Sequence, residues 1–369
     1  MDLLAELNGL DEEDVISAIR RETLPLVMWG AGSSAPEVSF YLESNGIHIS
    51  DIFVDDDFYT ESLMFQGRRV LSYSMLKQKY NRVNVILGNS NYEKKGALEE
   101  REIVNRAFCL FSISYNIFEK TPIAEIEQHI QEFESVYEML EDRKSKRNLL
   151  AYLKTRVSGD NRHIVNVFEK ETNFFHNDIF CIGNNEVYLD VGAFDGDTIR
   201  LFLNENNGCY RKIYAVEADE QNFERLQQFV KDSRINNVEL SKLGAWNKKE
   251  KLHFFSSCEQ VSGILLEENL VDRQERISIE AVPLDEMFDY SDKVTLLKIN
   301  YFEGVKETVE GAENILRKHM PNLAVTVGFD CRNIRSIPGI IKRINPNYKL
   351  YLRFNRGMTS GLVLYGVSI

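Results

Sequence analysis

Two short segments rich in acidic residues carry the strongest chemical signal in the sequence. The first, VYLDVGAFDGDTIR at 187–200, has an apolar run, a turn with Gly192 and Gly196, and the start of a helix. The second, IYAVEAD at 213–219, has an apolar run that leads to Glu217. Glycine lets the backbone pass close to a ligand, and a carboxylate can accept hydrogen bonds from both hydroxyls of a ribose. The pattern therefore predicts a Rossmann-type site for an adenosine cofactor.

The charge around this turn indicates which adenosine cofactor would bind. Asp190, Asp195 and Asp197 would repel a pyrophosphate, but they would attract a sulfonium and an α-ammonium group. We therefore expect S-adenosylmethionine rather than NAD. The residues expected around its methionine half are Asp190, Gly192, Ala193, Gly196, Asp197 and Thr198, and those expected at its ribose and adenine are Glu217, Ala218 and Asp219. The Thr198 hydroxyl could equally cap the helix that starts here.

Many further segments, in the same order along the chain, resemble the FkbM family of class I S-adenosylmethionine-dependent methyltransferases. Beside DVGAFDGDT and VEAD, they lie at 140–153, 173–180, 243–254, 282–287, 296–300, 309–327 and 337–353. The resemblance implies methyl transfer, typically to a hydroxyl of a sugar or secondary metabolite. It also implies that Ala245 and Trp246 lie near the adenine ring. Whether Trp246 stacks on that ring or is half-buried core stays open at this point.

The resemblance breaks at the residues that would face the methyl acceptor. The family usually reads KIDxEGAE after its fourth strand, whereas this chain has Asn300 in place of the aspartate, with Phe302 at the next acid position and Glu303 one residue late. Asparagine can orient a hydroxyl but cannot take its proton at neutral pH. We therefore expect a catalytic set of Asn300, Glu303 and Asp330. The alternative is a homologue that binds the cofactor but has lost or changed its reaction.

A second glycine turn, WGAGSSA at 29–35, follows another apolar run near the N-terminus. Gly30, Gly32, Ser33 and Asp55 fit a nucleotide-binding fingerprint, although one such fingerprint is a weak signal. The turn could present a nucleotide-linked sugar, or make the chain a nucleotide-sugar-modifying enzyme. It could equally belong to a structural domain or to a dimerising domain without a dinucleotide, and in the dimerising case the chain would form a homodimer. No catalytic set of a dehydrogenase accompanies it.

The alternation of apolar runs predicts an α/β chain with two Rossmann-like parts. We expect a smaller, doubly wound domain at 1–115, a helical connector at 116–180, and a methyltransferase domain of the class I Rossmann-like fold at 181–369. The connector should contain one long amphipathic helix over 121–153. Other expected helices lie at 3–21, 197–204, 220–231 and 304–318.

Composition restricts the partners. The 369 residues carry a net charge of −13, which argues against nucleic acid. No run approaches the ~20 apolar residues that cross a bilayer, and the N-terminus lacks a signal peptide pattern. The five cysteines are isolated in sequence, which suits reduced thiols in a reducing compartment. Neither these cysteines nor the six scattered histidines form a pattern that indicates a metal site. We expect a cytoplasmic protein that acts on a small-molecule or sugar acceptor.

Overall fold

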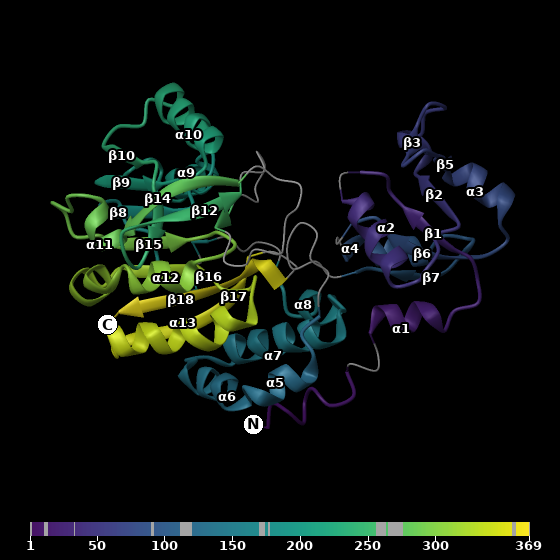
Figure 1. The fold of residues 1–369 in the computed structure, drawn as a ribbon, viewed down its shortest axis with the longest axis horizontal. Helices are drawn as coiled ribbons and strands as arrows, with labels where there is room; N and C mark the ends of the chain where they lie inside the picture. Colours follow the sequence, from purple (N-terminus) through teal and green to yellow (C-terminus); the bar gives the residue numbers. More distant parts are fainter. Residues whose placement is uncertain are drawn as a thin grey trace. The chain divides into compact units, whose positions relative to one another are not determined.

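The computed structural model describes residues 2–10, 14–32, 34–89, 92–110, 120–169, 174–175, 178–255, 263–264, 276–355 and 359–368 (Figure 1). These residues form two compact units. Unit 1 comprises the described parts of Met1–Ile130, Arg147–Phe168 and Arg356–Thr359, and unit 2 comprises those of Gln131–Lys146, Glu169–Asn355 and Ser360–Ile369. Among the described residues, no helix combines the length and the apolarity needed to cross a membrane.

Unit 1 contains a parallel sheet of five strands. Their order is β5 (Leu71–Ser72), β2 (Asp51–Val54), β1 (Leu26–Trp29), β6 (Val83–Leu87) and β7 (Val104–Phe108). The helices that pack on this sheet include α1 (Val15–Arg20), α2 (Ala35–Ser44), α3 (Tyr73–Lys79) and α4 (Glu93–Glu99), and a small hairpin is formed by β3 (Met64–Phe65) and β4 (Arg68–Arg69). Successive strand residues point to opposite faces, so the sheet has an apolar layer on each side.

The two apolar layers of unit 1 are covered by different helices. Met28 packs in one cluster with side chains of α1 and α2, while its neighbour Val27 packs in the other with Leu76 of α3 and Leu98 of α4. Helices therefore cover both faces of a parallel sheet. The doubly wound α/β arrangement expected for the N-terminal part is confirmed.

Unit 2 contains a larger sheet of seven strands. Their order is β10 (Val238–Ser241), β9 (Lys212–Val216), β8 (Val187–Val191), β15 (Leu296–Ile299), β16 (Asn322–Thr326), β18 (Leu362–Ser368) and β17 (Tyr348–Phe354). The first five are parallel, and β18 and β17 add an antiparallel pair. This is the Rossmann-like sheet predicted for the C-terminal part.

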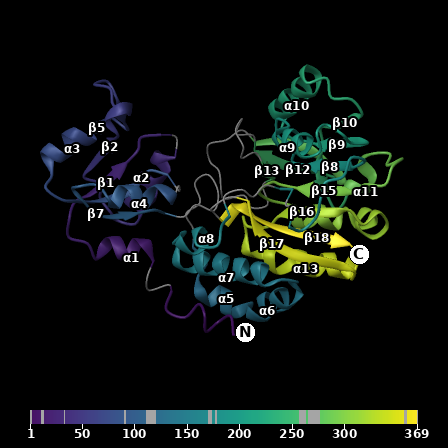
Figure 2. The same cartoon turned by 180° about the vertical axis from the view of Figure 1, so that it is seen from behind.

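Helices and a second sheet complete unit 2. The helices include α9 (Asp197–Glu205), α10 (Glu220–Asp232), α11 (Leu284–Met287), α12 (Val305–Glu310) and α13 (Cys331–Ile344). The second sheet has the order β11 (Gly244–Trp246), β14 (Arg276–Pro283), β12 (Glu250–Phe255) and β13 (Gly263–Ile264). Seen from behind, α13 lies along β17 (Figure 2).

Three of the expected helices differ in the structure. The helix expected over 121–153 is three helices: α5 (Ile123–Gln128), α6 (Ile130–Met139) and α7 (Arg143–Ser158). Between α6 and α7 the Glu141 N–H donates to the Leu350 carbonyl, and the Asp142 carboxylate accepts from the Ser145 N–H (2.7 Å), so strand pairing and a new N-cap interrupt the helix. The helix expected at 3–21 shortens to α1, which Asp14 caps. The one at 304–318 divides into α12 and a π-helical turn at Ile315–His319.

The sequence did not predict α13. Pro338 lies inside this helix, where it removes a backbone hydrogen bond and would ordinarily end the helix. The helix persists because its isoleucines form a buried stripe, and packing of an amphipathic face supplies most of a helix's stability. These buried isoleucines are Ile334, Ile337, Ile340, Ile341 and Ile344.

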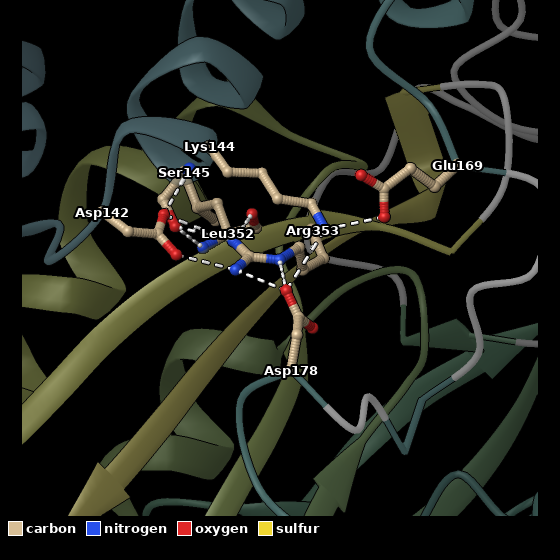
Figure 3. A network of polar contacts seen from close by, with 7 residues as sticks. All are labelled: Asp142, Lys144, Ser145, Glu169, Asp178, Leu352 and Arg353. Carbon is tan, nitrogen blue, oxygen red and sulfur yellow. Dashed lines mark hydrogen bonds and ion pairs between the residues drawn. The ribbon is translucent and has the colours of Figure 1, made fainter.

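A polar network around Arg353 joins three segments of unit 2 (Figure 3). The Arg353 side chain is 3% exposed, and its Nη2 contacts Asp142 (2.7 Å) and Asp178 (2.9 Å). Its Nη1 donates to the Ser145 hydroxyl, and Lys144 Nζ also contacts Asp178 (3.2 Å). Burial alone would raise the pKa of both carboxyls, but hydrogen bonds from Arg353 hold the pKa of each below its ordinary value. The network therefore ties the start of α7 and residue 178 to β17.

Replacing Arg353 by methionine should destabilise the protein by ~2 kcal/mol, because two carboxylates lose their shared cation. The expected loss of stability is smaller than for a fully buried ion pair, because the side chains of Asp142 and Asp178 are partly exposed to solvent. Urea unfolding at pH 7 measures the loss. Arg211→Met is the control, because Arg211 forms an exposed ion pair with Asp292 and should matter little.

The pH dependence distinguishes this electrostatic effect from lost packing. Carboxyls with a lowered pKa in the folded protein contribute stability above their ordinary pKa of 3.8, and this contribution is lost as the pH falls through the folded values. The deficit of Arg353→Met should therefore shrink below pH 3.8. A deficit that stays constant from pH 7 to pH 3 would contradict the ion-pair explanation.

Candidate cofactor and acceptor site

The carboxyl ends of neighbouring parallel strands bring the predicted site residues of unit 2 to one edge of the sheet. Val191 of β8 pairs with Val216 of β9 on one side and with Ile299 of β15 on the other. The residues that follow these strands are Gly192, Glu217 and Asn300. Ligands of open α/β sheets bind at this edge. Because β8 lies between β9 and β15, the residues predicted to bind the cofactor and those predicted to face the acceptor follow neighbouring strands.

Both glycines of the turn after β8 are required by the backbone. Gly192 (φ +75°) and Gly196 (φ +87°) lie in the left-handed region that favours glycine. A Cβ at Gly192 would come within 2.3 Å of the Asn300 carbonyl oxygen, and one at Gly196 would meet the Phe229 ring at 2.3 Å. Gly196 is also the N-cap of α9. The close approach that these glycines permit is therefore one between protein segments.

Glu217 is buried and held in place by two backbone amides. The Phe194 N–H donates to its Oε2 (2.8 Å), and the Asp219 N–H donates to its Oε1 (2.9 Å). Each oxygen keeps a second lone pair for another donor. Burial raises the pKa of Glu217 to about 7, and the two amides act against this shift. A fixed carboxylate of this kind can accept the two hydroxyls of a ribose.

A lysine that the sequence interpretation overlooked neutralises Asp190. Lys298 Nζ lies 2.8 Å from Asp190 Oδ1, both side chains are fully buried, and the same ammonium donates to the Gly192 carbonyl (2.7 Å). Burial raises the pKa of the Asp190 carboxyl, while Lys298 and the Thr198 hydroxyl oppose the shift. The sequence did contain one indication of this buried ion pair, because Lys298 lies inside the apolar run LLKIN.

Basic side chains balance part of the negative charge expected around this turn. The charge of Asp190 is balanced by Lys298, and Asp195 contacts Arg200 at 3.0 Å. Asp197 remains as the acid at the start of α9, where its Oδ1 accepts from the Thr198 N–H. Thr198 donates its hydroxyl to Asp190 Oδ2 (2.6 Å) and is not the N-cap of that helix. The turn is less negative than three unpaired aspartates would make it.

Two of the residues expected at the adenine, Trp246 and Ala218, lie in a small apolar cluster. Trp246 is 6% exposed, packs with Ile279 and Ala281, and has Ala218 against the same cluster. Its Nε1–H donates to Glu250. Trp246 is therefore buried in this cluster, and its stacking on an adenine ring stays a prediction. Two other expected residues have structural contacts of their own: Asp219 caps α10, and the Ala245 carbonyl accepts the Thr308 hydroxyl.

The expected acceptor residues follow β15 and β16. The Thr326 hydroxyl donates to Asn300 Oδ1 (2.8 Å). Asp330 caps α13 through the Arg332 N–H and contacts the Arg332 guanidinium at 2.6 Å. Glu303 is partly buried. Nearby, the rings of Phe302 and Phe329 meet edge to face, with centroids 5.4 Å apart.

The N-terminal glycine turn has an acid that is already paired. Asp55 Oδ1 contacts Arg101 Nη1 (2.6 Å) and accepts from Trp29 Nε1–H (3.3 Å). Gly30 has φ +100°, and a Cβ at Gly88 would lie 2.9 Å from the Gly30 carbonyl oxygen. Gly32 lies before α2, and Ser33 lies outside the described residues. A nucleotide would have to share Asp55 with Arg101.

Replacing Lys298 by methionine should cost about 3–5 kcal/mol of stability, because it leaves Asp190 buried without its cation. Urea unfolding at pH 7 measures the loss. The double variant Lys298→Met with Asp190→Asn should recover part of it, since no buried charge then remains. Equal stability of Lys298→Met and the wild type would show that the pair does not hold this edge together.

Known proteins support the fold. No protein-family model and no curated protein matches the sequence. Among solved structures, the crystal structure of methyltransferase FkbM from Methylobacillus flagellatus matches with a TM-score of 0.73 and 16% identity, over 99% of this chain and 95% of that chain. An rRNA methylase from Streptococcus thermophilus (TM-score 0.33, 17% identity, 51% of this chain and 89% of that one) and a SAM-dependent methyltransferase from Aquifex aeolicus (TM-score 0.32, 14% identity, 57% and 99%) are also similar. The chain therefore has, along nearly its whole length, the α/β fold of the FkbM methyltransferase structure.

Proposed function

We propose that the chain is an S-adenosylmethionine-dependent methyltransferase. The observation that carries this proposal is Glu217, a buried carboxylate at the end of β9 that two backbone amides orient beside the Gly192 turn. Its remaining lone pairs suit the hydroxyls of a ribose. The shared fold with a methyltransferase structure supports the same conclusion. When bound, S-adenosylmethionine supplies an electrophilic methyl group.

Different residues of unit 2 would bind different parts of this cofactor. Glu217 would bind the ribose, and Ala218 would lie at the adenine with the Trp246 cluster behind it. The turn from Gly192 to Gly196 would hold the methionine half, with Asp197 near its positive charge. Asp190 would act indirectly, because Lys298 and Thr198 enclose its carboxylate. Lys298 would then keep the turn in shape through the Gly192 carbonyl.

The acceptor is proposed to be a hydroxyl of a sugar or small metabolite. The Thr326 hydroxyl donates to the carboxamide oxygen of Asn300. The Nδ2–H group of Asn300 is therefore the part that would orient an acceptor oxygen. The proton of that hydroxyl needs another group. Asp330 caps α13 and contacts Arg332. We propose Glu303, which is partly buried and lies one residue beyond the lost acid position, as the base.

A second candidate function is a cofactor-binding protein whose reaction is altered or lost. It is favoured by the amide at Asn300 and by the pairing of Asp330 with Arg332. The nucleotide-sugar-modifying alternative has less support, because Asp55 is paired with Arg101. Binding of cofactor without transfer to any acceptor would favour the second candidate.

Calorimetric titration of S-adenosylhomocysteine tests the cofactor site. We expect micromolar binding to the wild type, about −8 kcal/mol, and at least tenfold weaker binding to Glu217→Ala. Glu220→Ala is the matched control, because Glu220 is three residues away, exposed, and paired with Lys242 at the surface. Circular dichroism confirms that each variant is folded. Equal affinity of Glu217→Ala and Glu220→Ala would refute the assigned role.

The raised pKa of Glu217 adds a pH signature to the same site. A ribose that donates to Glu217 favours the ionised carboxylate, so binding below pH 7 should release a proton. Affinity should rise with pH up to about 7 and then level off. Titration in two buffers of different ionisation enthalpy measures the released proton. Release that persists in Glu217→Gln would mean that another group loses it.

Transfer of a radiolabelled methyl group to a panel of sugars, nucleotide sugars and phenols tests the acceptor side. Glu303→Gln should lower the turnover by at least a hundredfold if Glu303 is the base, whereas Asp330→Asn should change it little. Both variants should bind S-adenosylhomocysteine like the wild type. Unchanged turnover in Glu303→Gln would remove Glu303 from the mechanism.

A further inference from the structure

Unit 1 contains a cavity whose lining includes no residue of either glycine turn. Its volume is about 320 Å³, within the size range of small-molecule sites. Three segments distant in sequence form its walls: α1 with the residue that follows it, the stretch from Tyr92 to Cys109, and Asp160 and Arg162 around the start of α8 (Arg162–Val165). Neither Gly30, Gly32 nor Asp55 lines it. A site here would be separate from the proposed cofactor site and from the N-terminal fingerprint.

The charge of the cavity wall is opposite to that of the chain. Four basic side chains line it (Arg21, Lys95, Arg106 and Arg162), against one acidic side chain, Asp160, whereas the whole chain has a net charge of −13. Like charges that converge on one concavity repel each other and raise the local concentration of anions. The concentration of cations here therefore favours an anionic occupant.

Contacts outside the cavity position two of these cations. Arg106 Nη1 contacts Glu22 (3.2 Å), and Lys95 Nζ contacts Glu99 (3.1 Å). Neither glutamate lines the cavity. Asp160 is the acid at the wall, and it contacts Arg162 Nε at 3.3 Å. The ion pairs thus fix the cationic side chains without placing a further carboxylate on the wall.

The rest of the cavity wall is apolar or aromatic, which suits the organic part of a ligand. Val15 and Ala18 of α1 and Phe108 of β7 supply apolar surface, and the Tyr92 ring lies beside Lys95. Arginine forms paired, directional hydrogen bonds with phosphate oxygens, which distinguishes it from lysine. Three arginines and one lysine around a cavity of this size match a phosphate or diphosphate that carries an organic group.

We propose that this cavity binds a small organic phosphate, with Arg106 and Lys95 among its anion ligands. The site belongs to unit 1 and does not depend on methyl transfer by unit 2. It gives unit 1 a ligand-binding role that the paired Asp55 does not supply.

Calorimetric titration of the full chain with inorganic pyrophosphate and with ADP tests the proposal. Both should bind the wild type, and the affinity should fall as NaCl is raised. Arg106→Gln and Lys95→Gln should each weaken binding at least tenfold, and Arg106→Lys should keep part of the affinity. Arg69→Gln is the control, because Arg69 is an exposed arginine of the same unit that contacts Tyr59 and does not line the cavity.

Titration of pyrophosphate into Glu217→Ala distinguishes binding in this cavity from binding at the proposed cofactor site. ADP contains an adenosine that could bind at Glu217, so pyrophosphate is the decisive probe and Glu217→Ala should leave its binding unchanged. Absence of pyrophosphate binding at millimolar concentration would overturn the proposal. Equal affinity of Arg106→Gln, Lys95→Gln and Arg69→Gln would also overturn it, as would loss of pyrophosphate binding in Glu217→Ala.

Discussion

The buried ion pair between Lys298 and Asp190 is the interaction on which the functional edge of unit 2 depends. It joins β15 to β8, and through the Gly192 carbonyl it also reaches the glycine turn. A charged pair without solvent exposure contributes little net stability, but removal of either member is costly because it leaves an uncompensated charge. The pair therefore fixes the relative positions of the turn, Asn300 and the end of β8. Glu217 can be oriented by the amide of Phe194 only if this turn has the observed shape.

The two halves of the site differ in how their polar groups are used. On the cofactor side, Glu217 is oriented by backbone amides, which leaves its outer lone pairs for a ligand. On the acceptor side, protein groups already engage Asn300 and Asp330, and an aromatic pair of Phe302 and Phe329 lies nearby. Cofactor binding thus follows more directly from the structure than catalysis does. The structure is therefore compatible with two functions, an active transferase and a cofactor-binding homologue.

Much of the fold was predictable because it rests on local patterns. The apolar runs that end at Val191 and Val216, and the glycines that follow the first, specify parallel strands and a tight turn. Lys298 was missed because its role depends on a partner 108 residues away. The break between α6 and α7 was missed because pairing with β17 interrupts an amphipathic pattern that is continuous in sequence. α13 was missed because tertiary packing overrides the effect of Pro338.

The central claim is that Glu217 and the Gly192 turn hold the adenosine of a methyl donor. A crystal structure of the protein with S-adenosylhomocysteine tests this most directly. We expect ligand density at the carboxyl ends of β8 and β9, with both ribose hydroxyls within hydrogen-bonding distance of the Glu217 carboxylate. Density for the ligand elsewhere, such as beside Gly30 in unit 1, with Glu217 bound only to its two amides, would contradict it.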